Sequence, residues 1–283
     1  MIDPKPNAVA GMDSLLTRPR TSHPSPTASL TKSLIIQFLE WFGDLGIFFW
    51  RVLRAAVTPP FEIRELFRQL DEVGSKSLPL VVMAGAATGI VLSMEARFSL
   101  TRFGAKSLLP AAIVFSIIHE TGPIITGLVV GGRTGAGIGA ELASMKVTEQ
   151  IDAIEASAVN PYRLLAAPRI LACILMLPLL TLAADFCGLV MGWVAQTLVE
   201  PVSFHQFINA GFNGADFNDF LPPTLKTMVF GLIIGLIACF QGMRTQGGAA
   251  GVGRAATSSV VLSSLFVILA DVVLVKLILI LFP

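Results

Sequence analysis

The stretch LLAAPRILACILMLPLLTLAADFCGLVMGWVAQTLV, residues 164–199, decides the fold class of this chain. Only Arg169 and Asp185 bring charge into it. It exceeds the roughly 20 residues that an α-helix needs to cross a hydrocarbon core about 30 Å thick. Such an overlong helix tilts, kinks or protrudes from the bilayer, and Pro168 and Pro178 favour a kink. The stretch therefore predicts a membrane-spanning helix.

The composition of the whole chain agrees with lipid as its main solvent. Of its 283 residues, 54% are hydrophobic and 14% are charged, whereas soluble domains carry about 25% charged residues. The formal net charge of +1 gives no reason to expect a nucleic-acid partner. The three cysteines lie in apolar runs and match no metal or redox motif, so we expect no disulfide. The three histidines are too scattered to suggest a metal site.

Four further apolar segments complete a predicted set of five spans, each long enough to cross a bilayer. They cover residues 78–96, 108–132, 222–243 and 259–282. The predicted fold class is an all-α integral membrane protein with an N-terminal interfacial helix, five transmembrane helices and a cytoplasmic helix between the second and third spans. The predicted organisation is a disordered tail at 1–33, interfacial helices at 34–77 and a membrane domain at 78–283.

The N-terminal region lacks the features of a spanning helix. Residues 1–33 are rich in Pro, Ser and Thr, which predicts disorder, and they do not resemble a signal peptide. Residues 34–57 are apolar, but a spanning helix would put Glu40 and Asp44 near mid-bilayer, at about 2.5–3.5 kcal/mol for an Asp. An interfacial helix keeps both carboxylates in water, so we favour it over a span. Residues 61–73 predict a short amphipathic surface helix.

The distribution of Lys and Arg predicts the orientation. Nine such residues precede the first span, and the loop at 200–221 has none. The N-terminus and the second and fourth loops are therefore predicted to be cytoplasmic, with the C-terminus outside. Arg97, Arg102 and Lys106 in the first loop oppose this assignment less strongly than the nine support it. The carboxylates of the predicted outer loop are Glu200, Asp216 and Asp219.

An ionisable pair, His119-Glu120, lies midway along the second predicted span. Such groups are costly in lipid without partners or water, so the pair is a functional hypothesis by default. A structural polar pair between helices is the alternative, and the residues alone leave both open. Asp185, Asp271 and Lys276 raise the same question. The last two are five positions apart, so they do not form a simple intrahelical pair.

The sequence GGRTGAGIG at 131–139 superficially resembles a phosphate-binding loop. It follows no predicted strand and lacks the Walker lysine, so we do not expect this chain to bind a nucleotide. Glycines at four-residue spacing, such as Gly85 and Gly89, allow helix backbones to approach closely in lipid. We therefore interpret most of these glycines as packing residues.

The loop after the second span predicts a docking element. Residues 141–158 read ELASMKVTEQIDAIEASA, which we expect to form one amphipathic helix ending before Asn160-Pro161. Its apolar stripe is Leu142, Met145, Ile151 and Ile154, and its acidic face is Glu149, Asp152 and Glu155. Helices that lie on anionic membranes are usually basic on the polar face, so we favour a soluble protein partner over a solvated helix without one.

The run from Glu120 to Arg169 resembles the signature of the MlaE/YrbE permease family. It reads ETGPIITGLVVGGRTGAGIGAELASMKVTEQIDAIEASAVNPYRLLAAPR, with cores at E-x-G-P, G-R-x-G-A and N-P-x-x-x-L-x-x-P-R. Residues 73–95 and 251–274 resemble the first and last spans of the family. The resemblance covers residues 34–283 and leaves the tail outside it.

The resemblance implies a permease subunit of a bacterial ABC transporter. Such a subunit moves phospholipids or related hydrophobic molecules between the inner membrane and the periplasm or outer membrane. Members pair as homodimers in the inner membrane and dock on a cytoplasmic ATPase, which binds ATP and Mg²⁺, so no cofactor is expected on this chain. A periplasmic MCE-domain hexamer and a small cytoplasmic STAS-type protein are the other implied partners.

The resemblance also implies roles for particular residues. The implied substrate-cavity residues are His119, Glu120, Met94 and Glu95. The implied ATPase-coupling residues are Glu141, Met145, Glu149, Gln150, Asp152 and Glu155. The implied structural motif residues are Gly122, Pro123, Gly132, Arg133, Gly135, Pro161, Pro168 and Arg169. Family members commonly carry a basic residue before the Glu of E-x-G-P, whereas this chain has His119, which puts a headgroup role at that position in doubt.

A second hypothesis, from another class, is a stand-alone secondary transporter or membrane scaffold that uses His119 and Glu120 as a proton relay. It leaves the acidic loop helix unexplained, and co-purification of a Walker-motif ATPase would discriminate between the two. No nucleophile–base arrangement or metal-ligand set supports an enzyme, so no catalytic residue is predicted.

Overall fold

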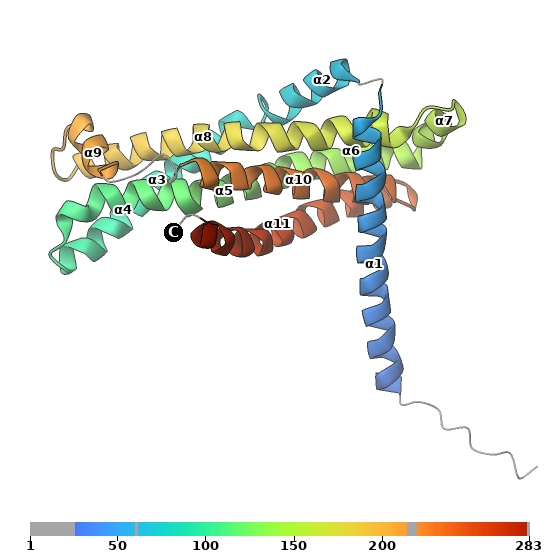
Figure 1. Ribbon diagram of the computed structural model, residues 1–283, viewed down its shortest axis with the longest axis horizontal. Coiled ribbons are helices and arrows are strands. Elements are labelled where there is room, and N and C mark those ends of the chain that lie inside the picture. The colour runs from blue at the N-terminus through green and yellow to red at the C-terminus, as the bar shows by residue number, and fades with distance from the viewer. Residues whose placement is uncertain (1–25, 60–61, 214–219, 282–283) are drawn as a thin grey trace, which may run out of the picture. The chain divides into compact units, whose positions relative to one another are not determined.

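The computed structural model describes residues 26–59, 62–213 and 220–281. The chain forms two compact units, residues 1–44 and 45–283. Every described element is a helix, and the second unit holds the helices labelled α2 to α11 in Figure 1. The all-α fold class predicted from the sequence is confirmed.

Helix α1 (Pro26–Val57) begins inside the segment predicted to be a disordered tail. Residues 26–33 are therefore helical, and the rest of that predicted tail lies outside the described residues. In the part of α1 that belongs to the larger unit, Phe48 and Val52 are buried while Trp50 is 66% exposed. Helix α1 is not among the helices long and apolar enough to cross a membrane. Its interfacial position stays a prediction.

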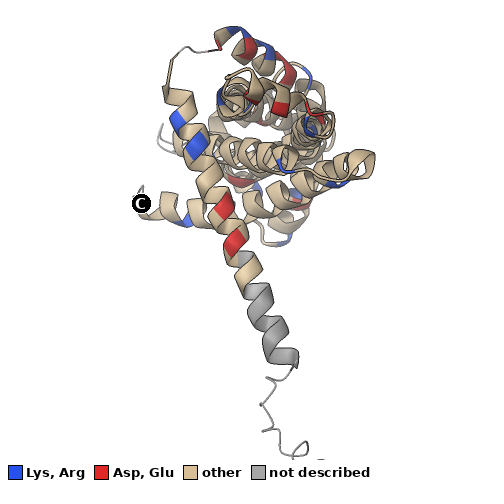
Figure 2. Cartoon of the chain, turned by 90° about the vertical axis from the view of Figure 1, so that its right-hand side faces the viewer, with Lys and Arg blue, Asp and Glu red and all other residues tan. Residues whose placement is uncertain are grey.

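Five helical segments of the described chain are long and apolar enough to span a membrane, as predicted. They are Ile63–Arg102, Lys106–Val147, Tyr162–Thr197, Leu221–Met243 and Gly248–Leu281. Figure 2, which views the bundle along its helices, shows charges of both signs on α2 (Ile63–Val73), at the top, whereas most of the bundle is tan. This contrast is what a lipid-embedded bundle with one amphipathic surface helix requires.

The spans consist of the following elements. The first segment joins the amphipathic surface helix α2 to the apolar helix α3 (Leu78–Arg102). The second contains η2 (Lys106–Leu108), α4 (Leu109–Ser116), η3 (Ile117–Thr121), α5 (Gly122–Val130), η4 (Gly131–Gly135) and α6 (Ala136–Val147). The third contains η5 (Tyr162–Ala166) and α8 (Ala167–Thr197). The last two are α10 (Leu221–Met243) and α11 (Gly248–Leu281).

Several span boundaries differ from the prediction, and the first span ends at Arg102 rather than at residue 96. The second span was expected to end at Gly132 but continues as helix to Val147, so GGRTGAGIG is helical rather than a loop. The fifth was expected to begin at Ser259 but begins at Gly248. Glycine-rich sequence argues against helix in water, because glycine loses much backbone entropy. In the second span, Gly131, Gly135 and Gly139 pack against α10 or α11, whereas Gly132 and Gly137 meet open space.

Close packing of α3 against α8 shows this effect directly. A Cβ added to Gly85 would lie 2.9 Å from the Cα of Ala184, and one added to Gly89 would lie 2.8 Å from the Cα of Gly188. Helix α8 also lies beside α10, and α10 beside α11 (Figure 1). The packing interpretation of the glycines at four-residue spacing is confirmed at these two positions.

The predicted single helix at 141–158 is wrong. The chain leaves α6 at Val147, and Glu149 adopts left-handed φ of 58°, which breaks the helix. A separate short helix, α7 (Gln150–Ala156), follows. Thr148 at the break donates its hydroxyl proton to the carbonyl of Ser144, 2.8 Å away.

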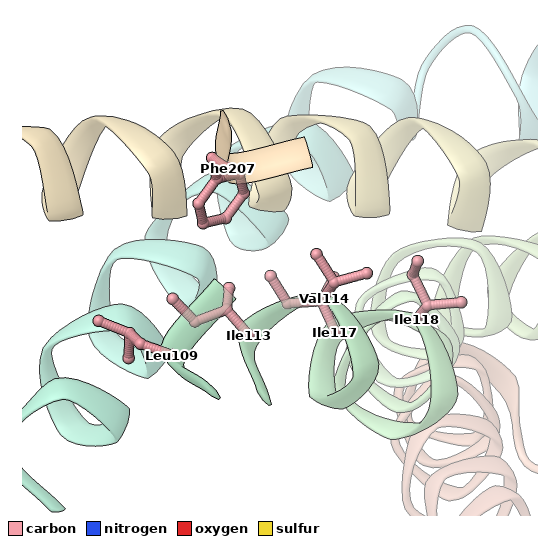
Figure 3. Packing of buried hydrophobic residues seen from close by; sticks show 6 residues of the cluster. All are labelled: Leu109, Ile113, Val114, Ile117, Ile118 and Phe207. Carbon is pink, nitrogen blue, oxygen red and sulfur yellow. The ribbon is translucent and has the colours of Figure 1, made fainter. Parts of the chain in front are cut away.

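Helix α9 (Phe204–Gly211) lies at the end of the bundle opposite α7 (Figure 1). Ser203 caps it, and Ser203 and Gln206 form a reciprocal capping box. Its Phe207 is fully buried among apolar side chains from the second span (Figure 3). These partners are Leu109, Ile113, Val114, Ile117 and Ile118. The loop predicted at 200–221 thus contains a packed helix, while Asp216 and Asp219 lie outside the described residues.

Candidate functional site

A buried lysine is the centre of a polar cluster between three spans. The side chain of Lys226, in the first two turns of α10, is 2% exposed. Its Nζ lies 2.9 Å from Oδ1 of Asp271 on α11 and 3.5 Å from Oε2 of Glu120 on η3. The Asp271 side chain is 8% exposed and that of Glu120 43%. A buried charge persists only when paired and hydrogen-bonded, and this arrangement supplies both conditions.

The E-x-G-P motif builds one side of this cluster. Glu120 supplies a carboxylate, and Lys226 donates to the carbonyl oxygen of His119 at 2.7 Å. Pro123 has no N–H, so it cannot make the α-helical bond to that carbonyl four residues earlier. The oxygen is thereby left open to a donor from another helix. The local π-helical turn at η3 is the kind of irregularity that often marks a functional site.

Gly122 of the same motif makes room for a second buried carboxylate. A Cβ at this position would collide with Asp185 of α8. Asp185 is 5% exposed, and its Oδ1 has no hydrogen-bond partner among the described residues. Asp185, an ionisable residue within a predicted span, is therefore packed against the motif rather than facing lipid.

An apolar cavity of about 480 Å³ adjoins the cluster. Residues from α3, the second span, α9 and the segment before α10 surround it. They include Leu100, Leu108, Phe115, Ile118, His119 and Phe220. The His119 ring stacks on Phe115 with 3.9 Å between ring centroids. His119 thus joins the two features, since its ring lines the cavity and its carbonyl binds Lys226.

The structure does not bring all four implied cavity residues together. His119 lines the cavity and Glu120 belongs to the adjoining cluster, whereas Met94 and Glu95 are exposed on α3 and are not among the lining residues. The sequence interpretation missed Lys226. Its signal was present, because a lysine inside the apolar stretch 222–243 needs a buried acidic partner. Asp271 is that partner, from a different helix.

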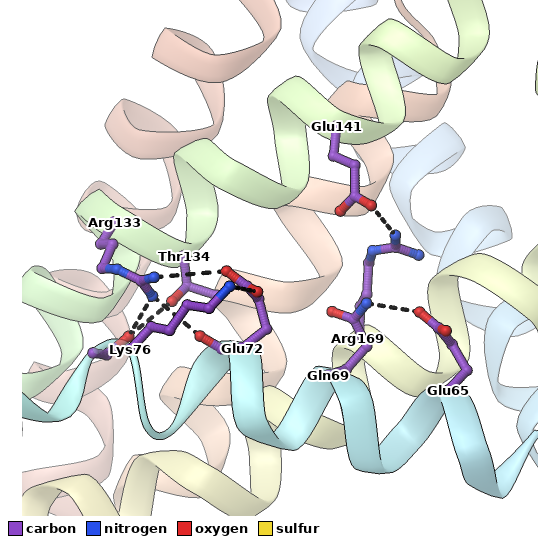
Figure 4. Close-up of polar contacts among 9 residues, drawn as sticks. Glu65, Gln69, Glu72, Lys76, Arg133, Thr134, Glu141 and Arg169 are labelled. Carbon is purple, nitrogen blue, oxygen red and sulfur yellow. Dashed lines mark hydrogen bonds and ion pairs between the residues drawn. The ribbon is translucent and has the colours of Figure 1, made fainter.

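Motif residues at the other end of the bundle form a second polar network (Figure 4). Arg133 donates to the carbonyl of Glu72 at 3.1 Å and to the hydroxyl of Ser77 at 3.0 Å. Arg169 is 2% exposed and lies 2.9 Å from Oε1 of Glu141. The two arginines therefore tie the second span to the α2–α3 corner and to the start of the third span, as structural residues would.

The other implied structural residues occupy packing positions. Pro161 is buried before η5, and Pro168 lies in the first turn of α8, directly after the π-helical turn η5. A Cβ on Gly135 would touch Ser263 of α11 at 3.5 Å, whereas one on Gly132 would meet open space.

The implied coupling residues are divided between two elements. Glu141 and Met145 belong to α6, while Gln150, Asp152 and Glu155 belong to α7. Glu149, Asp152 and Glu155 are all exposed. Lys146 lies 2.5 Å from Asp152, so one carboxylate of the predicted acidic face has a cation beside it.

At the opposite end, Glu200 interacts with two of the three cations that opposed the predicted orientation. Its Oε1 lies 2.9 Å from Lys106 Nζ and 3.0 Å from Arg97 Nη2. Hydrogen bonding to Lys106, together with attraction from Lys106 and Arg97, holds the pKa of Glu200 below its usual value. The third, Arg102, stacks on Phe98 with its guanidinium carbon 4.7 Å from the ring centroid.

Comparison with known proteins places these features in a family. The family model described as Permease MlaE matches residues 66–277. The chain belongs to the MlaE permease family. The match includes the Lys226 cluster, the cavity and both ends of the second span, so the motifs that resembled this family are confirmed. The chain is a multi-pass membrane permease of the MlaE family.

Individual relatives agree. A probable ABC transporter permease protein of Rickettsia typhi is 34% identical over 250 residues, covering 88% of this chain and 96% of the relative. One of a Synechocystis strain is 32% identical over 208 residues, covering 74% and 79%. The chloroplastic protein TRIGALACTOSYLDIACYLGLYCEROL 1 of Arabidopsis thaliana is 32% identical over 211 residues, covering 75% of this MlaE-family chain and 60% of the plant protein.

Proposed function

We propose that this chain is the membrane subunit of an ABC transporter that moves phospholipids or related hydrophobic molecules between the inner membrane and the periplasm or outer membrane. The cavity of about 480 Å³ beside the buried ion-pair cluster carries this proposal. Its walls are largely apolar, and its size falls in the usual range of ligand pockets, about 300–1,000 Å³. Relatives named as probable ABC transporter permeases, and one named after a galactosylated diacylglycerol, support it.

A separate cytoplasmic ATPase supplies the energy in this proposal. The exposed acidic residues of α7 and the preceding turn are the proposed docking surface: Glu149, Asp152 and Glu155. ATP hydrolysis drives transport through this surface only if the ATPase contacts it differently in its two states. ATP and Mg²⁺ bind the partner, and this chain supplies the path for the lipid.

The remaining partners follow the family resemblance. A second copy of the chain is proposed to pair with it, and α11 offers an exposed apolar surface for this contact or for lipid. The surface includes Leu265, Ile268, Leu269, Val272 and Val273. An MCE-domain hexamer outside and a STAS-type protein inside complete the proposed assembly in the bacterial inner membrane.

A proton-coupled transporter remains the alternative, favoured by one observation. Asp185 is a buried carboxylate whose Oδ1 has no hydrogen-bond partner among the described residues, and such groups mark proton pathways in membrane proteins. Under this alternative the chain needs no ATPase.

Purification from the native membrane with mass spectrometry tests both. We expect phospholipid and an ATPase with a Walker motif to co-purify with the chain. Transport by the chain alone in proteoliposomes, driven by a proton gradient and independent of ATP, would overturn the ABC proposal and support the alternative.

A further inference from the structure

Two cations share one carboxylate where α3 ends and the second span begins. Arg97 and Lys106 both contact Oε1 of Glu200, at 3.0 and 2.9 Å. Two positive charges and one negative charge leave this group of three with a net charge of +1. Glu95 does not neutralise this remaining charge, since it lies two positions before Arg97 and residues two positions apart on a helix do not face each other. The cluster therefore retains attraction for a further anion.

Arg97 also has an unused hydrogen-bond donor. Its Nη2 contacts Glu200, but its Nη1 is buried and has no hydrogen-bond partner among the described residues. A buried donor without an acceptor is destabilising, and most are satisfied in folded proteins. An anion with several oxygens can accept from Nη1 and from Lys106 together, because arginine donors form a fixed fork suited to phosphate and carboxylate.

Residues close in sequence to both cations line the apolar cavity. Leu100, one helical turn after Arg97, lines that cavity, as does Leu108, two residues after Lys106. A ligand that satisfies both surfaces has an anionic group joined to apolar chains. A phosphodiester suits these cations, because its two anionic oxygens can accept hydrogen bonds from donors on two sides.

We propose that Arg97 and Lys106 form a binding subsite for the phosphodiester of a phospholipid whose acyl chains enter the cavity lined by Leu100 and Leu108, with Glu200 occupying the subsite until the phosphate replaces it. This inference rests on the proposed lipid transport and adds the residues that recognise the headgroup. Glu200 is 45% exposed in its side chain, so it can move into water when it is displaced.

Lipid binding to the purified full-length protein in detergent tests the subsite. Native mass spectrometry compares phosphatidylglycerol with diacylglycerol of the same acyl chains, which lacks the phosphate. We expect the wild type to prefer phosphatidylglycerol, and Arg97→Gln/Lys106→Gln to lower that preference at least about tenfold, the effect of losing one to two charge-assisted hydrogen bonds. Binding of diacylglycerol stays unchanged. Glu200→Gln, which removes the competing carboxylate, raises phosphatidylglycerol binding.

Arg102→Gln is the matched control, because this residue lies near the same helix end but stacks on Phe98. It leaves the preference intact, and Arg97→Lys retains part of it. Equal loss of both lipids in the double variant, or an unchanged preference, overturns the subsite. Inorganic phosphate that binds as tightly as the lipid shows a free-anion site and also overturns it. If the wild type binds neither lipid, both the subsite and the proposed lipid transport are wrong. If it binds both lipids without preferring the phosphate, only the subsite is wrong.

Discussion

Replacing Lys226 with methionine tests the buried cluster most directly. The substitution keeps a long side chain but removes the cation whose Nζ lies 2.9 Å from Asp271. Asp271 is then left with its side chain 8% exposed and without that counter-charge. Removing one partner of a buried pair typically costs about 3–5 kcal/mol.

Glu120 adds little to that cost. Its side chain is 43% exposed and 3.5 Å from Nζ, so water can solvate it after the lysine is lost. Exposed pairs are worth about 0–1 kcal/mol. We therefore expect Lys226→Met to lower the free energy of unfolding by about 3–5 kcal/mol and Glu120→Gln by about 1 kcal/mol or less.

Reversible unfolding in mixed micelles, followed by circular dichroism, measures these changes. The double variant Lys226→Met/Asp271→Leu should recover most of the loss, because a buried ion pair is often replaced by apolar residues at little cost. Lys276→Met is the control, since this lysine is exposed on α11, and it should change stability by about 0.5 kcal/mol or less. A single Lys226→Met variant as stable as the wild type would refute the reasoning.

Lipid transport by the same variants separates the two readings of the cluster. If it serves only to hold the helices together, the double variant regains transport with stability. If its charges act in transport, the double variant is stable but inactive, and Glu120→Gln loses transport without losing stability.

Three further predictions address other regions. The triple variant Glu149→Lys, Asp152→Lys, Glu155→Lys reverses the charge of the acidic surface. It should abolish co-purification of the ATPase without affecting membrane insertion. A fully coupled ATPase in this variant would show that the surface is merely solvated. Gly89→Val should destabilise the protein by at least about 1–3 kcal/mol through overpacking against α8, whereas Gly132→Ala, which meets open space, should not, so equal effects in thermal unfolding would contradict the packing. Because the pKa of Glu200 is lowered in the folded state, its carboxylate should stabilise the protein above the unfolded pKa, and this stabilisation should be lost as pH falls through the lower folded pKa. Unfolding midpoints measured against pH should not show this loss in Glu200→Gln. Identical pH profiles of the wild type and this variant would refute the prediction.

The five spans were predictable because lipid imposes a simple rule. Long apolar segments must be helical to satisfy their backbone groups, and that rule needs no knowledge of neighbours. Span boundaries were harder wherever glycine occurs. The stretch GGRTGAGIG looks like a loop in sequence, but it is helical, and three of its glycines (Gly131, Gly135 and Gly139) face neighbouring helices, as Gly139 faces Ser259.

The candidate site was predictable only in part. His119 and Glu120 were recognisable as ionisable residues within a span, and the family was recognisable from its motif. Lys226 and Asp271 are 45 positions apart in sequence, and no local pattern indicates that they meet. The break at Glu149 was missed although the apolar positions shift phase there. In one continuous helix Leu142 and Met145 would lie on one face, and Ile151 and Ile154 on the opposite one, so the left-handed turn between them restores two consistent faces.

The sequence by itself determined the solvent, the number of spans and the family of this protein, because hydropathy and a long motif depend on local residue order alone. The tertiary structure decided which buried charges neutralise one another and where the cavity lies. Pro123 shows the difference: the sequence reveals that a helical carbonyl loses its usual donor, but only the packing of α10 against η3 reveals that Lys226 replaces it.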